Sequence, residues 1–129
     1  QFHLTPPFIR YLSEVAFIKL GDATITGIPG ELYPEIAVGG IESPKGADFA
    51  IEPQEVPPLR GQLPGKLNLM VNLANDAIGY IIPKSEWDKD APWIYDESEE
   101  TYGEVVSLGP NTAPVIHQTV IKLAEESKP

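Results

Sequence analysis

Apolar and polar residues follow a strand-like pattern in two runs near the start of the chain. Residues 14–20 and 23–28 are rich in Val, Ile, Phe and Thr, and Gly21-Asp22 separates them. Two such runs joined by a two-residue turn with glycine first are typical of a β-hairpin. Because apolar residues occupy both faces of the first run, the pattern predicts an interior strand rather than an edge strand.

The segment after the hairpin predicts a short helix and then a long loop. Residues 31–38 follow a Pro-Gly turn, place Pro34 in the first helical turn and end before two glycines. Residues 41–65 contain five prolines and show little periodicity. A stretch of this length without regular structure is usually functional or inserted, so we interpret residues 41–65 as a Pro-rich loop or insertion.

The middle of the chain predicts one more strand followed by turns. Residues 67–73 form an apolar run that suits a buried strand. Asn75 and Asp76 favour a turn after it, because both side chains bond readily to nearby backbone. Ser85 is suited to cap a short helical turn.

The last segment predicts a C-terminal helix that is capped by Thr112 and has Pro114 in its first turn. Apolar residues recur there at helical spacing and give one buried stripe, formed by Ile116, Val120, Leu123 and Ala124. The order of the predicted elements is strand, strand, helix, loop, strand, turn and helix. We therefore predict an α/β or α+β fold, with residues 1–129 forming a single piece.

The charge of the chain excludes some classes of partner. Its 19 acidic and 9 basic residues give a formal net charge of −10, so a polyanion is repelled and we expect no nucleic-acid partner. The absence of cysteine excludes disulfides, thiolate metal sites and cysteine nucleophiles. The sequence contains no G-x-S-x-G elbow, no P-loop and no G-x-G-x-x-G motif.

Two residues near predicted strand ends are candidates for a site. Glu31 follows Pro29-Gly30 where a strand is expected to end and a helix to start. It either stabilises the positive end of that helix or serves as a hard ligand for a divalent cation. Tyr80 comes after an Asn-Asp turn. It is either a core tyrosine with a bonded hydroxyl or a phenol that binds metal or an oxyanion.

The two histidines give little support for a metal site. His3 and His117 are far apart in the sequence and form neither His-x-His nor His-x-x-x-His spacing. His117 lies at the border of the apolar stripe of the predicted C-terminal helix, which favours a structural or surface role.

Three segments together resemble the neutral/alkaline non-lysosomal ceramidase family. Gly27-Ile-Pro-Gly-Glu31 follows the predicted hairpin, as the family's PGE segment does. Residues 73–83 are similar to the later segment in which a tyrosine precedes a short Pro-containing turn. Tyr102-Gly-Glu104, followed by Ser107-Leu-Gly-Pro110 and the closing helix, is similar to the end of the family's catalytic domain. The three segments occur in the family's order, within residues 13–126.

The resemblance implies an activity and a metal site. Family members hydrolyse the amide of ceramide through a catalytic zinc, which acts as a Lewis acid and activates water. By position, Glu31 and Tyr80 match two of the zinc ligands, and two histidines from earlier in the domain supply the others. The resemblance implies zinc in the parent protein, a lipid or other N-acyl amide substrate, and an extracellular or periplasmic location.

The chain departs from the family in several places. The zinc histidines and a serine-containing segment are expected upstream, and neither His3 nor His117 stands at a matching position. The Pro-rich stretch is longer than in ceramidases, and the wording of residues 74–80 is closer to uncharacterised bacterial relatives. We therefore expect this C-terminal portion to be inactive alone and to pack against the upstream part of the same protein. The alternatives are a non-catalytic binding or structural module and a hydrolase of another amide or ester.

Two structural expectations follow. Glu31 and Tyr80, separated by 80 − 31 = 49 positions, are predicted to lie side by side. The hairpin is predicted to expose an apolar patch beside Val15, Phe17 and Ile25, or to cover it by self-association.

Overall fold

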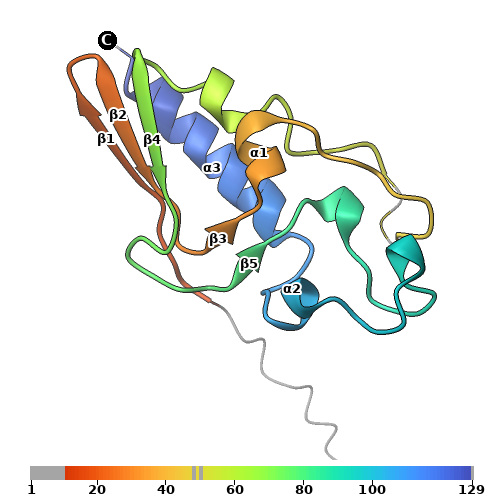
Figure 1. Cartoon of the computed structure of the whole chain (residues 1–129). Helices are drawn as coiled ribbons and strands as arrows, with labels where there is room; N and C mark the ends of the chain where they lie inside the picture. Colours follow the sequence, from red (N-terminus) through yellow and green to blue (C-terminus); the bar gives the residue numbers. More distant parts are fainter. Residues whose placement is uncertain (1–10, 48, 50, 129) are drawn as a thin grey trace, which may run out of the picture.

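Two small β-sheets and a long C-terminal helix form the frame of the described molecule (Figure 1). The structure is a computed structural model that describes residues 11–47, 49 and 51–128. The strands are β1 (Ala16–Leu20), β2 (Ala23–Gly27), β3 (Glu31–Leu32), β4 (Leu67–Val71) and β5 (Tyr80–Ile81). The helices are α1 (Pro34–Val38), α2 (Tyr102–Val105) and α3 (Thr112–Glu126), and 3-10 turns occur at η1 (Leu59–Gly61), η2 (Lys84–Glu86) and η3 (Ile94–Asp96). This mixture of strands and helices confirms the predicted fold class.

The hairpin prediction is confirmed. β1 and β2 pair antiparallel around the Gly21-Asp22 turn, with Ile18 opposite Ile25. β4 then adds to β2 in parallel, which gives the sheet order β1-β2-β4. The prediction of an interior strand for the first run is therefore wrong, because β1 forms an edge of this sheet and β2 lies at its centre.

One face of the three-stranded sheet, the inner face, is turned toward the hydrophobic core, and α3 contacts the sheet at β1. The inner face carries Phe17, Thr24, Thr26, Asn68 and Met70. Phe17 and Met70 pack against the hydrophobic core, to which α3 contributes a stripe with the predicted spacing. Of the predicted stripe, Ile116, Val120 and Ala124 are buried and Leu123 is only half-buried, and Ala113 is buried as well. Thr112 is the first residue of α3 and not its cap, because the N-cap position is taken by Asn111.

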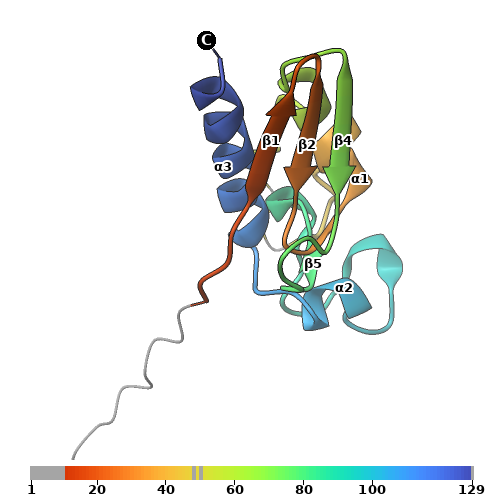
Figure 2. The same ribbon diagram turned by 90° about the vertical axis from the view of Figure 1, so that its left-hand side faces the viewer.

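The opposite face, the outer face, is more apolar and is not covered by a helix of the described chain (Figure 2). Its side chains are aliphatic in all three strands, and five of them are between 47% and 62% exposed. The prediction of a buried strand at residues 67–73 is therefore wrong within this chain. The outer face is formed by Ile18, Leu20, Ile25, Leu67, Leu69 and Val71.

The predicted apolar patch on the hairpin exists, but its residues differ from the expected ones. Ile18, Leu20 and Ile25 lie on the outer face, as Ile25 was predicted to do. Val15 and Phe17 pack against the core instead. The reason is strand alternation: Phe17 points to the face opposite to Ile18 and so toward α3.

The predicted helix at residues 31–38 begins later than expected. Glu31 and Leu32 form β3, and the helix starts at Pro34, whose missing N–H is harmless in a first turn. The main-chain N–H groups of Glu31 and Tyr33 donate to the carbonyl oxygens of Gly79 and Ile81, at 2.9 and 3.1 Å. A strand partner distant in sequence therefore holds residues 31–33 extended, and Glu31 does not lie in a helical turn.

The Pro-rich loop is anchored to the rest of the molecule at two buried side chains. Glu55 is buried, and its Oε1 accepts a hydrogen bond from the main-chain N–H of Lys84 at 3.1 Å. His117 Nε2 donates to the carbonyl oxygen of Pro57 at 2.9 Å. The structural role predicted for His117 is consistent with this contact.

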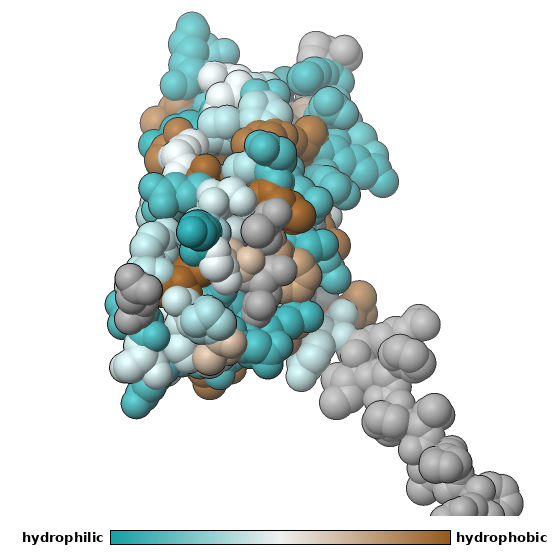
Figure 3. Space-filling view, turned by 90° about the vertical axis from the view of Figure 1, so that its right-hand side faces the viewer, coloured by the Kyte–Doolittle hydropathy of each residue, from teal (hydrophilic) through white to brown (hydrophobic). Residues whose placement is uncertain are grey.

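On the side of the molecule seen in Figure 3, apolar residues form separate small areas among hydrophilic ones.

The turn predictions have a mixed outcome. Asp76 Oδ1 accepts a hydrogen bond from the N–H of Ala77, and Asn75 has a left-handed φ of 68°, so both residues form the turn as predicted. Ser85 lies inside η2 and does not cap it, because its hydroxyl donates to the carbonyl oxygen of Glu42 at 2.6 Å. None of the helices in the described part of the chain is long and apolar enough to cross a membrane.

Candidate functional site

The candidate site is built on the pairing of β3 with β5, next to α2 (Figure 1). Two glycines allow the chain segments to approach closely. A Cβ at Gly30 would meet the carbonyl oxygen of Gly79. A Cβ at Gly79, whose φ is +86°, would meet the carbonyl oxygen of Val106. The same carbonyl of Val106 accepts the N–H of Tyr80 at 3.3 Å, so β5 lies between β3 and the end of α2.

Glu31 and Tyr80 are direct partners in the parallel β3–β5 pair. Paired residues of adjacent parallel strands lie about 5 Å apart and direct their side chains to the same face. The next pair, Leu32 and Ile81, belongs to the hydrophobic core. Because side chains alternate, Glu31 and Tyr80 both point away from that core, and both are half-buried. The structure thus brings the two candidate residues together.

Two further tyrosines flank Tyr80. The rings of Tyr33 and Tyr80 meet edge to face, with centroids 6.2 Å apart and an angle of 80°. The ring of Tyr102, which belongs to α2, also meets the Tyr80 ring edge to face, with centroids 6.1 Å apart and an angle of 75° between the ring planes. Edge-to-face contacts of this kind stabilise aromatic pairs beyond the area they bury. The orientation of the Tyr80 ring is therefore set by its neighbours on β3 and α2.

The surroundings of these tyrosines are acidic. Burial raises the pKa of Tyr33, and the nearby Glu104 and Glu86 carboxylates raise it further. The Tyr33 hydroxyl lies against Gly103, where an added Cβ would come within 2.7 Å of its oxygen. Tyr33 is therefore neutral at pH 7, and its hydroxyl group lies beside Gly103 of α2.

The donor set near Glu31 and Tyr80 is incomplete for a catalytic zinc. His117 lies on α3 with its Nε2 bonded to Pro57, and His3 is outside the described residues. Within residues 11–47, 49 and 51–128, no group of three or more His, Asp or Glu side chains is placed to hold a metal ion. A carboxylate is an ordinary zinc ligand, and the phenol beside it is one only in the resemblance, so the residues present fit zinc as part of a site and not as a complete one.

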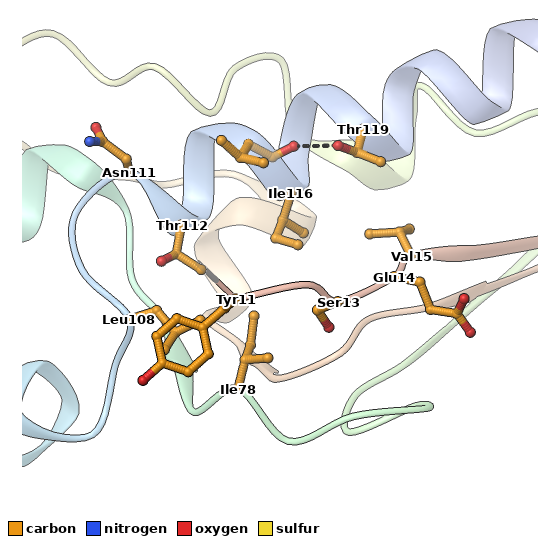
Figure 4. Close-up of a pocket in the computed structure, with 11 residues that line it drawn as sticks. Tyr11, Ser13, Glu14, Val15, Ile78, Leu108, Asn111, Thr112, Ile116 and Thr119 are labelled. Carbon is orange, nitrogen blue, oxygen red and sulfur yellow. Dashed lines mark hydrogen bonds between the residues drawn. The ribbon is translucent and has the colours of Figure 1, made fainter. Parts of the chain in front are cut away.

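A cavity of about 320 Å³ lies beside this region, between the segment before β1 and the start of α3 (Figure 4). Its lining includes Tyr11, Ile78, Leu108 and Ile116, and neither Glu31 nor Tyr80. In the close-up, Ile116 points from α3 toward the N-terminal segment. The cavity is adjacent to the candidate site in sequence, through Ile78, but it does not contain the candidate residues.

Tyr33 is the site residue that sequence reasoning missed. A helix over residues 31–38 places Tyr33 away from Glu31, whereas a strand places residues i and i+2 on one face. The signal available in the sequence was Pro34, because a residue before proline favours extended backbone. Tyr102 was noted only as part of a family-like segment.

No family model, no curated protein and no solved structure matches the chain.

Proposed function

We propose that the chain is the C-terminal portion of a ceramidase-like zinc amidohydrolase that cleaves an N-acyl amide such as ceramide. The observation that carries the proposal is the direct pairing of Glu31 with Tyr80, with both side chains on one face. These two residues come from separate family-like segments 49 positions apart, as 80 − 31 shows. A resemblance in three short segments does not by itself require such a pairing.

In this proposal Glu31 and Tyr80 are two of the zinc ligands, and two histidines of the upstream part complete the set. When bound, zinc supplies a Lewis acid and lowers the pKa of bound water to about 7. The protein's own contribution is positioning. The β3–β5 pair fixes the two donor groups side by side, and the rings of Tyr33 and Tyr102 orient the phenol of Tyr80.

The partner in this proposal is the upstream part of the same protein, and the outer face supports it. Ile18, Leu69 and Val71 on the outer face are each 47% exposed, whereas Thr24 and Thr26 on the inner face are buried. A sheet with one solvated face normally turns its polar side chains to water and its aliphatic ones inward. The reversed arrangement suits an outer face that another layer covers in the parent protein.

Zinc content and hydrolysis in the full-length parent protein test the proposal. We expect Glu31→Gln and Tyr80→Phe to lower zinc affinity at least about tenfold, since even outer-shell partners of metal ligands contribute that much. Hydrolysis of a fluorescent N-acyl sphingosine is expected to fall in parallel. Tyr95→Phe is the matched control, because Tyr95 is an exposed tyrosine bonded to Glu42 and lies outside the family-like segments.

The isolated chain gives an independent arm of the test. With two ligands only, it is expected to bind zinc weakly or not at all in a calorimetric titration. Stoichiometric submicromolar binding that disappears in Glu31→Ala would show that this chain contains a complete site. Unchanged zinc content in the full-length Glu31→Gln protein would contradict the zinc assignment and leave the non-catalytic module as the better reading.

A further inference from the structure

The cavity of about 320 Å³ between the segment before β1 and the start of α3 is lined mostly by apolar side chains (Figure 4). Three of them belong to the hydrophobic core or pack against it, and three others are between 40% and 68% exposed. The first three are Val15, Ile78 and Ile116, and the exposed three are Tyr11, Leu108 and Val115. A hollow of this size with exposed apolar walls is typical of a ligand site. We call this cavity the apolar pocket.

Three polar side chains in the lining of the apolar pocket are already engaged within the chain. The Thr119 hydroxyl donates to a carbonyl oxygen of its own helix at 2.7 Å. The Ser13 hydroxyl donates to Asp76 Oδ2 at 2.8 Å. Asn111 Oδ1 accepts a hydrogen bond from Lys84 Nζ at 2.9 Å. A polar ligand would find few free partners here and would lose its own hydration, so the apolar pocket suits a hydrocarbon chain.

A second hollow, of about 330 Å³, adjoins the apolar pocket and shares Ser13 and Glu14 with it. Its lining also includes Asp76. Hydrogen bonds from the Ala77 N–H and the Ser13 hydroxyl lower the pKa of Asp76, so this carboxylate is ionised at neutral pH. Within the described part of the chain, Glu14 and Asp76 are the only charged residues that line either hollow. In the close-up, Glu14 lies at the end of the apolar pocket away from Tyr11 (Figure 4). We call the second hollow the acidic hollow.

We propose that the two hollows bind one aliphatic ammonium ion, with its hydrocarbon chain in the apolar pocket and its cationic head in the acidic hollow near Glu14 and Asp76. Charge complementarity identifies the head group, because two carboxylates and a formal net charge of −10 attract a cation and repel a carboxylate or a phosphate. The hydrocarbon chain supplies most of the affinity, since burying one methylene group strengthens binding about fourfold. A cavity at the lower end of the usual size range suits a free amine with one chain. The inference rests on the two hollows and is separate from the zinc assignment.

Isothermal titration calorimetry of the whole, unmodified chain tests the inference with octylammonium, hexylammonium, octanoate and octanol. We expect octylammonium to bind at least about fivefold more tightly than hexylammonium, because two more methylene groups are buried. We expect it to bind at least about tenfold more tightly than octanoate, because the charge of the head group is reversed beside two carboxylates. Octanol is expected to bind with an affinity between these two. An affinity that does not depend on the charge of the head group, or on the length of the chain, would overturn the inference.

Methyl NMR of the same chain shows where the ligand binds. Octylammonium is expected to shift the methyl signals of Ile78 and Val115 in the apolar pocket and to leave those of Ile18 and Leu69 on the outer face unchanged. Shifts confined to the outer face would overturn the inference, because an exposed aliphatic surface also attracts a hydrocarbon chain. The Glu31→Gln chain is expected to bind octylammonium as the unmodified chain does, which separates this result from the test of the zinc site.

Variants of exposed residues separate the contacts of the head group from those of the hydrocarbon chain. We expect Glu14→Gln and Asp76→Asn each to weaken octylammonium binding about threefold, as for the loss of an exposed ion pair, and to leave octanol binding unchanged. Val115→Gln is expected to weaken the binding of both ligands at least about threefold, because it removes apolar surface from the pocket. Glu97→Gln and Leu20→Gln change an exposed carboxylate and an exposed leucine outside both hollows, and these matched controls are expected to bind as the unmodified chain does. Equal octylammonium binding by the pocket variants and the controls would overturn the inference.

Discussion

The two faces of the β1-β2-β4 sheet differ in which side chains they bury: the inner face buries polar side chains, and the outer face exposes aliphatic ones. On the inner face, Thr24 and Thr26 are fully buried. On the outer face, Leu67 and Leu69 of β4 remain about half exposed. A one-residue shift of a strand exchanges its two faces, so this arrangement is specified by the register and by the core against which the inner face packs. The difference teaches that both faces of this sheet are suited to packing against a further layer of structure. The described chain supplies such a layer for the inner face only.

The largest expected effect separates a residue of the covered core from one of the outer face. Ile36 of α1 is 0% exposed and Ile18 of the outer face is 47% exposed. We expect Ile36→Ala to lower the free energy of unfolding by about 2–5 kcal/mol, because it leaves a cavity. Ile18→Ala is expected to lower it by less than about 1 kcal/mol. Urea unfolding followed by tryptophan fluorescence measures both. Equal losses would mean that the outer face is buried in solution.

The next effect concerns self-association through the outer face. An exposed aliphatic surface beside an edge strand is prone to pair with another copy. We expect the chain to show a concentration-dependent mass in sedimentation velocity and the double variant Leu67→Ser, Leu69→Ser to remain monomeric. Val115→Ser, which replaces an exposed aliphatic residue on α3, is the matched control and is expected to associate as before. A monomeric unmodified chain at all concentrations would contradict this expectation.

Local patterns in the sequence were sufficient for elements whose contacts are close in the chain. The hairpin was predicted because its strands are joined by two residues, and α3 because its stripe repeats within one helix. Burial could not be predicted in this way. The apolar run at Leu67 reads as buried, but its exposure depends on which layer lies above it.

The candidate site was only partly accessible to sequence reasoning, for a related reason. Glu31 was assigned to a helix because the residues that follow it in the sequence favour a helix. Its strand partner Tyr80 lies 49 positions later in the chain (80 − 31 = 49). The expectation that the two lie together came from the family resemblance. The pairing could not be predicted from periodicity or composition, because strands of two residues are too short to produce a pattern in the sequence.

A smaller effect is expected inside the inner face, where two buried threonines of one strand differ. The hydroxyl of Thr24 donates to Asn68 Oδ1, whereas Thr26 Oγ1 is buried without a partner. We expect Thr24→Val to lower the free energy of unfolding by about 1 kcal/mol and Thr26→Val to raise it by a similar amount. Each variant is the control for the other, since both exchange a hydroxyl for a methyl group. If both variants changed the free energy of unfolding in the same direction, the two hydroxyl groups would have similar surroundings, and this expectation would be wrong.

The smallest expected effect is a pH dependence that arises from Glu86, a half-buried carboxylate of η2. Burial raises the pKa of Glu86 above its ordinary value of 4.5, and the nearby Glu35, Glu42 and Glu55 carboxylates raise it further, against one hydrogen bond from the Glu42 N–H. The folded chain therefore binds more protons than the unfolded chain just above that value. By linkage, the free energy of unfolding falls as the pH rises from 4.5 through the raised pKa and then stays lower.

Glu86→Gln removes this titration and keeps an oxygen that accepts the Glu42 N–H. The variant is expected to lose less stability than the unmodified chain between pH 4.5 and neutral pH, and the difference between the two curves isolates Glu86. Urea midpoints measured across this range in the presence of chelator provide the test. Glu97→Gln, an exposed carboxylate, is the control and is expected to follow the unmodified curve. Superimposable curves for Glu86→Gln and the unmodified chain would contradict this expectation. They would show that water solvates the Glu86 carboxylate in the folded chain.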